Sequence, residues 1–132
     1  MRTCFLAYAL GLLLGSLIPM AGDSAGPRIL IDLNPGVQNL LHIPAFMGLF
    51  VLGASAFQGM RKSKRYVFLG LAVVIYGIFL ESVQVFVPGR YVSLLDVLLN
   101  SSGVILGAIL VCYVRKRAAK KSSVHHSQSH SR

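Results

Sequence analysis

Four apolar runs, each long enough to cross a lipid bilayer as a helix, constrain this chain more than any other feature. They cover residues 3–20, 39–59, 66–87 and 94–114. A bilayer core of about 30 Å needs roughly 20 apolar residues of helix. Only 13% of the residues are charged, against about 25% in soluble domains, so a water-facing surface cannot be covered. We predict an all-α integral membrane bundle of four transmembrane helices, forming one domain over residues 1–114.

The basic residues predict which way the helices run. Of the 13 Lys and Arg residues, only Arg28 and Arg90 fall on one side of the predicted membrane. The remaining eleven lie at the N-terminus, at 61–65 and beyond residue 114. Cytoplasmic ends of transmembrane helices carry such an excess, so we expect both termini in the cytoplasm. The net charge of +9 is therefore better explained by membrane topology than by nucleic-acid binding.

Residues 115–132 differ in composition from the rest of the chain. The segment begins RKRAAKK and ends in a polar, apolar-poor stretch. Such a composition cannot bury enough apolar surface to fold, so we predict a basic, disordered cytoplasmic tail. Its basic part is expected to lie against anionic lipid of the inner leaflet.

The first apolar run has a second interpretation. A basic start, an apolar stretch and the later small residues MAGDSAG are also typical of a cleaved signal peptide. The run is longer than a typical signal core, and Gly11-x-x-x-Gly15 offers a helix-packing face, so we favour retention. Gly103-x-x-x-Gly107, in the last run, is interpreted in the same way as a face for close helix packing.

Four polar residues share one depth near the outer surface. Glu81 lies roughly 22 Å along the outward-running third helix, while Asp96 and Asn100 lie within roughly 10 Å of the outer end of the fourth. His42 lies within about a turn of the outer start of the second helix. Ionisable groups inside a membrane pair with one another or line a wet cavity, so we expect these side chains to meet.

Two further residues extend this predicted cluster. Gln84 shares a helix face with Glu81, at the spacing i,i+3. Arg90 follows Pro88-Gly89 in the short outer turn, where it can pair with an acid or hold a phosphate or carboxylate. The candidate ligand-binding residues are His42, Glu81, Gln84, Arg90, Asp96 and Asn100.

Each of these residues also has a purely structural interpretation. Asp96 stands three residues after Ser93, which is the spacing of a helix capping box. Gln84 and Asn100 can be hydrogen-bond contacts between helices, and Arg90 can simply reach lipid headgroups. Glu81 fits a structural interpretation least well, because it lies deep in the apolar region on a helix with no basic residue nearby.

The same residues resemble a known family. Glu81-x-x-Gln84, Pro88-Gly89-Arg90 and Asp96-x-x-x-Asn100 in this order, with His42 earlier, are similar to the VanZ-like family of small multi-pass membrane proteins. The resemblance implies a bacterial cytoplasmic membrane protein linked to the cell envelope, in a family named after a member that gives resistance to the glycopeptide teicoplanin. The chain departs from the pattern at Gln38-Asn39, where the family usually has Asp-Lys before the histidine.

Three functions remain open. The first is a non-enzymatic envelope protein whose outer cluster binds an anionic lipid headgroup, a lipid-linked wall precursor or a lipophilic antibiotic. The second is an enzyme acting on a lipid phosphate, with His42 as nucleophile or general base. The third is a structural bundle inside a larger complex or oligomer. No HExxH, GxSxG or CxxC pattern occurs, so we predict no metal or cofactor and favour binding over catalysis.

Overall fold

A computed structural model describes residues 1–18, 35–57, 62–87 and 93–129 of the chain. These residues form α-helices and, within the described ranges, no strand. The helices are α1 (Arg2–Ser16), α3 (Pro35–Leu40), α4 (His42–Ala56), α5 (Lys62–Gln84) and α6 (Leu94–Ser129). The all-α prediction is confirmed for this part of the chain.

A single residue separates α3 from α4. The backbone bonds continue on both sides of it, since Leu41 N–H donates to Val37 O and Ala45 N–H donates to Leu41 O. Pro44 has no N–H to offer the carbonyl of Leu40, and its ring crowds that carbonyl. The proline therefore interrupts an otherwise nearly continuous helical segment from Pro35 to Ala56.

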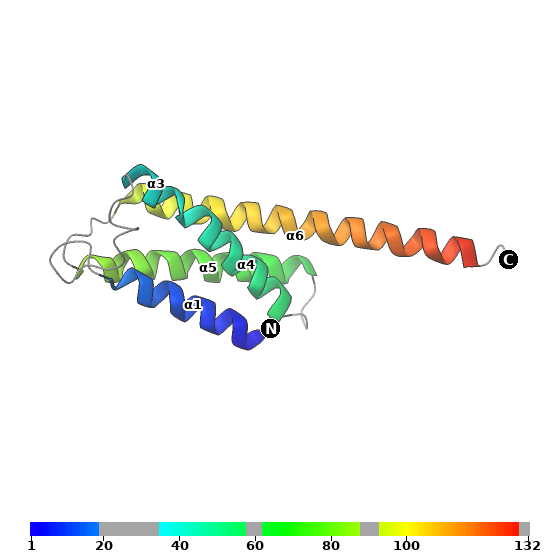
Figure 1. Cartoon of the computed structure of the whole chain (residues 1–132), viewed down its shortest axis with the longest axis horizontal. Coiled ribbons are helices and arrows are strands. Elements are labelled where there is room, and N and C mark those ends of the chain that lie inside the picture. Colours follow the sequence, from blue (N-terminus) through cyan, green and yellow to red (C-terminus); the bar gives the residue numbers. More distant parts are fainter. Residues whose placement is uncertain (19–34, 58–61, 88–92, 130–132) are drawn as a thin grey trace.

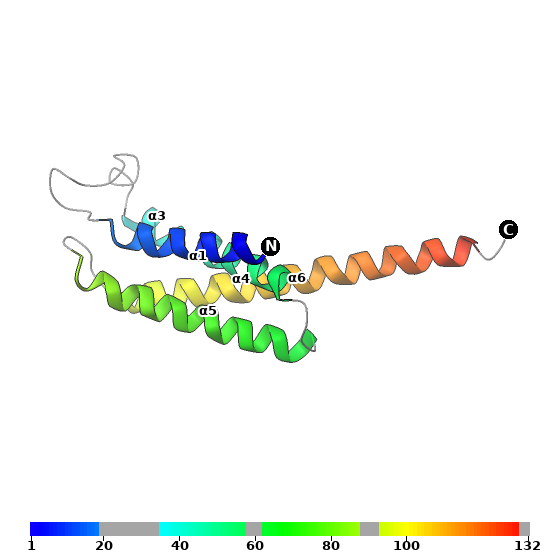
Figure 2. The same cartoon turned by 90° about the horizontal axis from the view of Figure 1, so that it is seen from below.

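The helices alternate in direction along the chain (Figure 1). The end of α1, the start of α3 and α4, the end of α5 and the start of α6 lie together at one end of the bundle, and we call this the polar end. The opposite end holds Arg2 and the first turns of α5, and we call it the basic end. Figure 2 shows from a second side that α6 continues well beyond the basic end.

The core forms where α4 lies against α5 and α6. Its fully buried side chains include Phe46, Leu49 and Phe50 of α4. The structure places Gly103 and Gly107 at the contact of α6 with α4: a Cβ on Gly103 would collide with the backbone oxygen of Ile43. Only glycine allows the two backbones to come this close.

Helix α1 is attached through aromatic side chains and not through its glycines. Tyr8 Oη donates to Ala45 O of α4 at 3.2 Å, and Tyr76 Oη of α5 donates to Ala9 O. A Cβ at Gly11 or Gly15 would have open space around it. The interpretation of Gly11-x-x-x-Gly15 as a packing face is therefore wrong within this bundle.

Two of the four predicted spans are long and apolar enough by themselves to cross a membrane. They lie within α5 and α6, over Lys64–Gln84 and Leu94–Lys121. The other two predicted spans, 3–20 and 39–59, correspond to the shorter apolar helices Arg2–Ser16 and His42–Ala56. The second is short because Pro44 sets α3 apart from α4.

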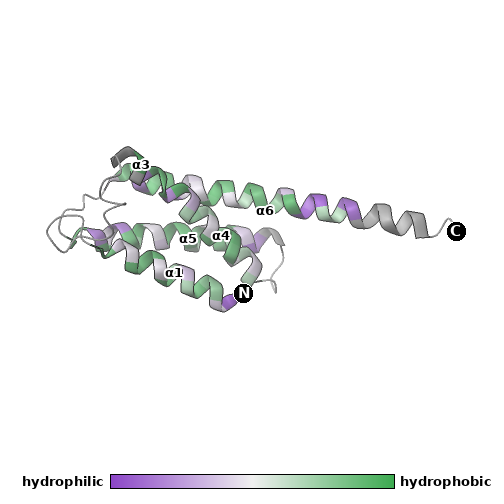
Figure 3. Cartoon of the chain, viewed as in Figure 1, coloured by the Kyte–Doolittle hydropathy of each residue, from purple (hydrophilic) through white to green (hydrophobic). Residues whose placement is uncertain are grey.

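The C-terminal segment differs from the prediction. Helix α6 does not end near residue 114 but continues through the basic residues to Ser129, where the composition predicted disordered chain. Lys, Arg and Ala are strong helix formers, so a helix that has already started can extend through RKRAAKK without tertiary contacts. Figure 3 shows the change from apolar to hydrophilic residues where α6 leaves the bundle.

Candidate functional site

Four of the predicted site residues come from three helices and meet at the polar end. His42 is the first residue of α4, Glu81 lies in the last turn of α5, and Asp96 and Asn100 lie in the first two turns of α6. Their helix ends coincide because neighbouring helices are antiparallel. Glu81 and Asn100 are each only 2% exposed. The structure thus brings buried polar groups from α5 and α6 close to His42 of α4.

Asn100 connects the histidine to the glutamate. Its Oδ1 lies 2.8 Å from His42 Nδ1, and its Nδ2 donates to Glu81 Oε1 at 3.4 Å. His42 Nδ1 is also 3.9 Å from Glu81 Oε1, close enough for an ion pair when the ring is protonated. We call the three side chains the His–Asn–Glu chain.

The hydrogen bonds of this chain determine the tautomer of the histidine. An ionised carboxylate only accepts hydrogen bonds, so Glu81 requires the Nδ2 side of the Asn100 amide. The amide then presents Oδ1, which also only accepts, to His42 Nδ1. With an ionised Glu81 and a neutral imidazole, the proton therefore sits on Nδ1, and Nε2 of His42 is left as an acceptor.

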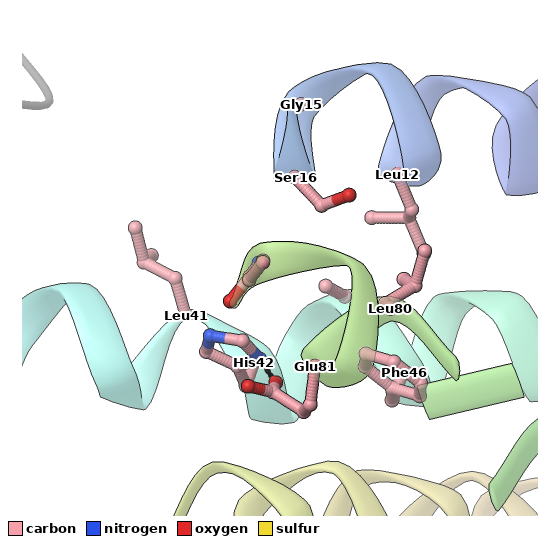
Figure 4. A pocket seen from close by; sticks show the side chains of 10 residues that line it. Leu12, Gly15, Ser16, Leu41, His42, Phe46, Leu80 and Glu81 are labelled. Atoms are coloured by element: carbon pink, nitrogen blue, oxygen red, sulfur yellow. Dashed lines mark ion pairs between the residues drawn. The ribbon is translucent and has the colours of Figure 1, made fainter. Parts of the chain in front are cut away.

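A pocket of about 160 Å³ lies beside the His–Asn–Glu chain, between α1, α4 and α5. Figure 4 shows the side chains of Ser16, His42 and Glu81 directed toward this hollow. Its lining is completed by apolar groups and Gln84: Leu12, Gly15, Leu41, Ala45, Phe46, Leu80 and Gln84. A cavity of about 150 Å³ is large enough for a molecule the size of benzene, so the pocket can hold part of a ligand as well as water.

Gln84 and Asp96 have different positions relative to the pocket. Gln84 is buried and lines it. Asp96 is also buried, but it is not part of the lining, and its Oδ1 has no hydrogen-bond partner among the described residues. Ser93 Oγ accepts from the backbone N–H of Leu95 at 3.1 Å, as a helix N-cap does. The position of Asp96 in the first turn suits the positive end of the helix dipole.

Some sequence predictions concern residues outside the described ranges. Arg90 and the Pro88-Gly89 turn lie in 88–92, which the structure does not describe. The departure from the family pattern, Gln38-Asn39, in contrast lies within the described ranges, in α3.

Helix α1 supplies lining that the sequence reasoning missed. Leu12, Gly15 and Ser16 form one wall of the pocket, and Ser16 is buried there, donating to Leu13 O at 2.7 Å. The helical rise places Ser16 near the outer end of the first apolar run, at the depth of the predicted cluster. That depth was the available signal, because Ser16 is a polar residue close to the end of an otherwise apolar helix.

The donor set offers little to a metal ion. Among the described residues, no group of three or more His, Cys, Asp or Glu side chains lies close enough to hold one. Catalytic zinc sites use three protein ligands, whereas the pocket lining contains one imidazole and one carboxylate.

Comparison with known families supports the resemblance seen in the sequence. The model of the VanZ/LLP1 family matches residues 5–115, which include every residue that lines the polar pocket. Comparisons with curated proteins and with solved structures give no match. The chain belongs to the VanZ/LLP1 family.

Proposed function

We propose that the chain is an integral protein of the bacterial cytoplasmic membrane that spans it four times, with both termini in the cytoplasm. Helices α5 and α6 are each long enough to span, and the segment from Pro35 to Ala56 amounts to about 33 Å of helix. Lys and Arg concentrate at the basic end, as on cytoplasmic sides. Large apolar side chains exposed along α5 and α6, such as Phe68, Ile75 and Ile105, suit contact with lipid.

We propose further that α1 stays in the mature protein. A signal peptide has no partner in the mature fold, whereas α1 is bonded to α4 and α5 through Tyr8 and Tyr76. It also forms a wall of the polar pocket. Cleavage would open the pocket on one side and expose the apolar surface of α4 and α5 that α1 covers.

The proposed activity is the binding of the polar head of an amphiphile at the outer leaflet. The observation that carries it is the His–Asn–Glu chain, with Asn100 and Glu81 buried, bordering a pocket between three helices. Buried polar groups are costly unless they have partners. Helix–helix bonding accounts for Asn100, but it does not account for a pocket into which His42, Glu81 and Gln84 also open.

The chemistry of the lining favours a head group rich in hydrogen-bond donors. Glu81 and the Nε2 of His42 accept, and the Ser16 hydroxyl, which already donates to Leu13, can also accept. Gln84 can do both. Hydroxyl, amide N–H or ammonium groups fit such a lining. Lipid-linked envelope precursors, lipophilic glycopeptide antibiotics and amine-bearing lipid heads all carry them.

An anionic part of the same ligand would be held by Arg90. This residue lies just after α5 in the sequence, three residues beyond the last described position of that segment. A guanidinium there would bind a phosphate or carboxylate in bidentate fashion. A head group with donors for Glu81 and an anion for Arg90 would satisfy both ends of the site.

Thermal unfolding in detergent, with and without native lipid extract, tests this function. The variants are Glu81→Gln, Arg90→Ala and their double mutant, with Ser82→Ala as the control because Ser82 is an exposed neighbour on α5. Binding predicts that lipid stabilises the wild type and Ser82→Ala but no longer stabilises the folded site variants. If lipid has no effect and the two substitutions lower stability non-additively, the residues form a structural pair, and the binding proposal fails.

A second candidate function is catalysis on a lipid phosphate or ester. The specific observation in its favour is the orientation of His42, whose Nδ1 is held by Asn100 while Nε2 is available as a base. An asparagine plays the same orienting role beside the histidine of papain-like proteases. Turnover of a lipid phosphate by the purified wild type, lost in His42→Ala, would establish it, and equal rates in both would exclude it.

A further inference from the structure

The basic end of the bundle contains a buried cation, Arg65, and no acid of the described residues pairs with it. Arg65, in the first turn of α5, is only 3% exposed. Its Nη2 donates to Tyr66 Oη at 3.2 Å, while its Nε is buried without a hydrogen-bond partner among the described residues. A guanidinium stays charged, and a buried charge is costly unless it is paired.

A second guanidinium lies against the same tyrosine. The Cζ atoms of Arg65 and Arg115 are 5.0 and 5.6 Å from the centre of the Tyr66 ring. Arg115 also donates to Ala54 O at 3.4 Å, near the C-terminus of α4. Two like charges beside one ring repel each other, so the arrangement favours a negative group that binds both.

No acidic side chain in the described part of the chain can play this role. Its acids, Glu81 and Asp96, lie at the polar end, near the last turn of α5 and the first turn of α6. Arg115 is 21 residues after Leu94, or about 32 Å along α6. That separation is close to the thickness of a bilayer core, so the guanidiniums lie at the membrane surface opposite to the polar pocket.

An apolar hollow borders Tyr66, the ring that both guanidiniums contact. It has a volume of about 400 Å³ and lies between the start of α5 and the middle of α6. Its lining residues are Tyr66, Ala108, Ile109, Cys112, Tyr113 and Lys116. Tyr66 thus borders the hollow while contacting both guanidiniums, and Lys116 adds an exposed ammonium.

We propose that this place is a binding site for an anionic phospholipid of the leaflet at the basic end. Arg65 and Arg115, with Lys116, bind its phosphate, because guanidiniums match phosphate oxygens in bidentate fashion. The first part of an acyl chain lies in the hollow beside Ala108 and Ile109. The apolar wall is what selects a lipid over a free phosphate ion, since an ion would gain nothing from it. The site is separate from the polar pocket and does not depend on the function proposed for that pocket.

Lipid binding by the purified full-length protein, measured by native mass spectrometry, tests the proposal. Phosphatidylglycerol, phosphatidylcholine and inorganic phosphate are the three probes. Both lipids carry the phosphate, but the choline cation of phosphatidylcholine is repelled by the two guanidiniums. We therefore expect the wild type to prefer phosphatidylglycerol over phosphatidylcholine about tenfold. Arg65→Gln should abolish that preference, and Arg115→Gln should weaken it.

The control separates this site from general electrostatics. Lys121→Gln removes the same charge from an exposed position of α6 and should keep the preference. Should Arg65→Gln fail to fold, the half-buried Arg115 provides the test. Equal binding of both lipids by the wild type would overturn the proposal. So would equal effects of Arg65→Gln, Arg115→Gln and Lys121→Gln, or displacement of phosphatidylglycerol by millimolar inorganic phosphate.

Discussion

His42 Nδ1 lies 2.8 Å from Asn100 Oδ1, although 58 residues separate them in sequence. This contact joins the first turn of α4 to the second turn of α6, and the same amide continues to Glu81 on α5. Asn100 is therefore the residue through which three helices share one polar network. Networks of this kind are stabilising when every member has a partner and costly when one is removed.

Replacement of Asn100 by alanine should strongly destabilise the protein. It leaves His42 Nδ1 and Glu81 Oε1 without the amide, and an unsatisfied buried polar group costs about 1–3 kcal/mol. We expect a loss of about 2 kcal/mol or more in the free energy of unfolding, measured by denaturant or thermal unfolding in detergent. Ser102→Ala is the control, since this exposed hydroxyl bonds only to Leu98 of its own helix. Equal stabilities of the two variants would contradict the role assigned to Asn100.

A methyl group at Gly103 should be tolerated far less well than one at Gly11. The Cβ of Gly103→Ala meets the Ile43 backbone, and forced overpacking costs about 1–3 kcal/mol. Gly11→Ala has open space and gains up to about 1 kcal/mol of helix propensity. The melting temperatures of the two variants should therefore move in opposite directions. A destabilised Gly11→Ala would show that α1 packs through its glycines against a partner outside this bundle.

Gln84→Leu should impair ligand binding without lowering stability. Gln84 lines the pocket but is not a member of the His–Asn–Glu chain, so leucine fills a similar volume and breaks none of that chain's bonds. We expect the stabilisation of the protein by native lipid extract to fall at least severalfold, while the melting temperature of the ligand-free protein stays close to that of the wild type. An unchanged response to lipid would remove Gln84 from the binding site.

The proposed topology predicts which positions an impermeant reagent can reach. In a background with Cys4→Ser and Cys112→Ser, Leu94→Cys and Lys121→Cys provide one exposed thiol at each end of the apolar segment Leu94–Lys121 of α6. An impermeant maleimide added to intact cells should label Leu94→Cys and leave Lys121→Cys unmodified. Inside-out vesicles should give the opposite result. Labelling of Lys121→Cys on intact cells would reverse the assignment of both termini.

The depth of the polar residues could be predicted from the sequence, but their pairing could not. The lengths of the apolar runs predict that successive helices alternate in direction. The rise per residue then places His42, Glu81 and Asn100 at one depth in the membrane. Which side chain faces which depends on rotation about each helix axis, and close packing determines that rotation. Gly77 illustrates the point: a Cβ there would lie 3.2 Å from Asn100 Nδ2. Composition contains no such information.

Other parts of the structure differ from the predictions for physical reasons that act locally. Pro44 removes one backbone donor and thereby separates α4, which holds most of the second apolar run, from α3. The basic segment after residue 114 was predicted to be disordered because it is polar, yet α6 continues through it. The apolar surface of a segment decides whether it packs against the rest of the protein, while its helix propensity decides whether it forms a helix. In RKRAAKK the apolar surface is small but the helix propensity is high.

The polar side of the pocket and its wall on α1 belong to different helices, and this determines how the pocket can change its width. The bonds of the His–Asn–Glu chain join α4, α5 and α6, and the close approach at Gly103 holds the backbones of α4 and α6 together. The wall formed by Leu12, Gly15 and Ser16 belongs to α1, which takes no part in that chain. A tilt of α1 can therefore widen or narrow the pocket while the histidine keeps its tautomer and orientation. The polar side of the site is therefore fixed, while the wall on α1 can move. Such a pocket can admit acyl chains of different width while the polar groups that recognise the ligand stay in place.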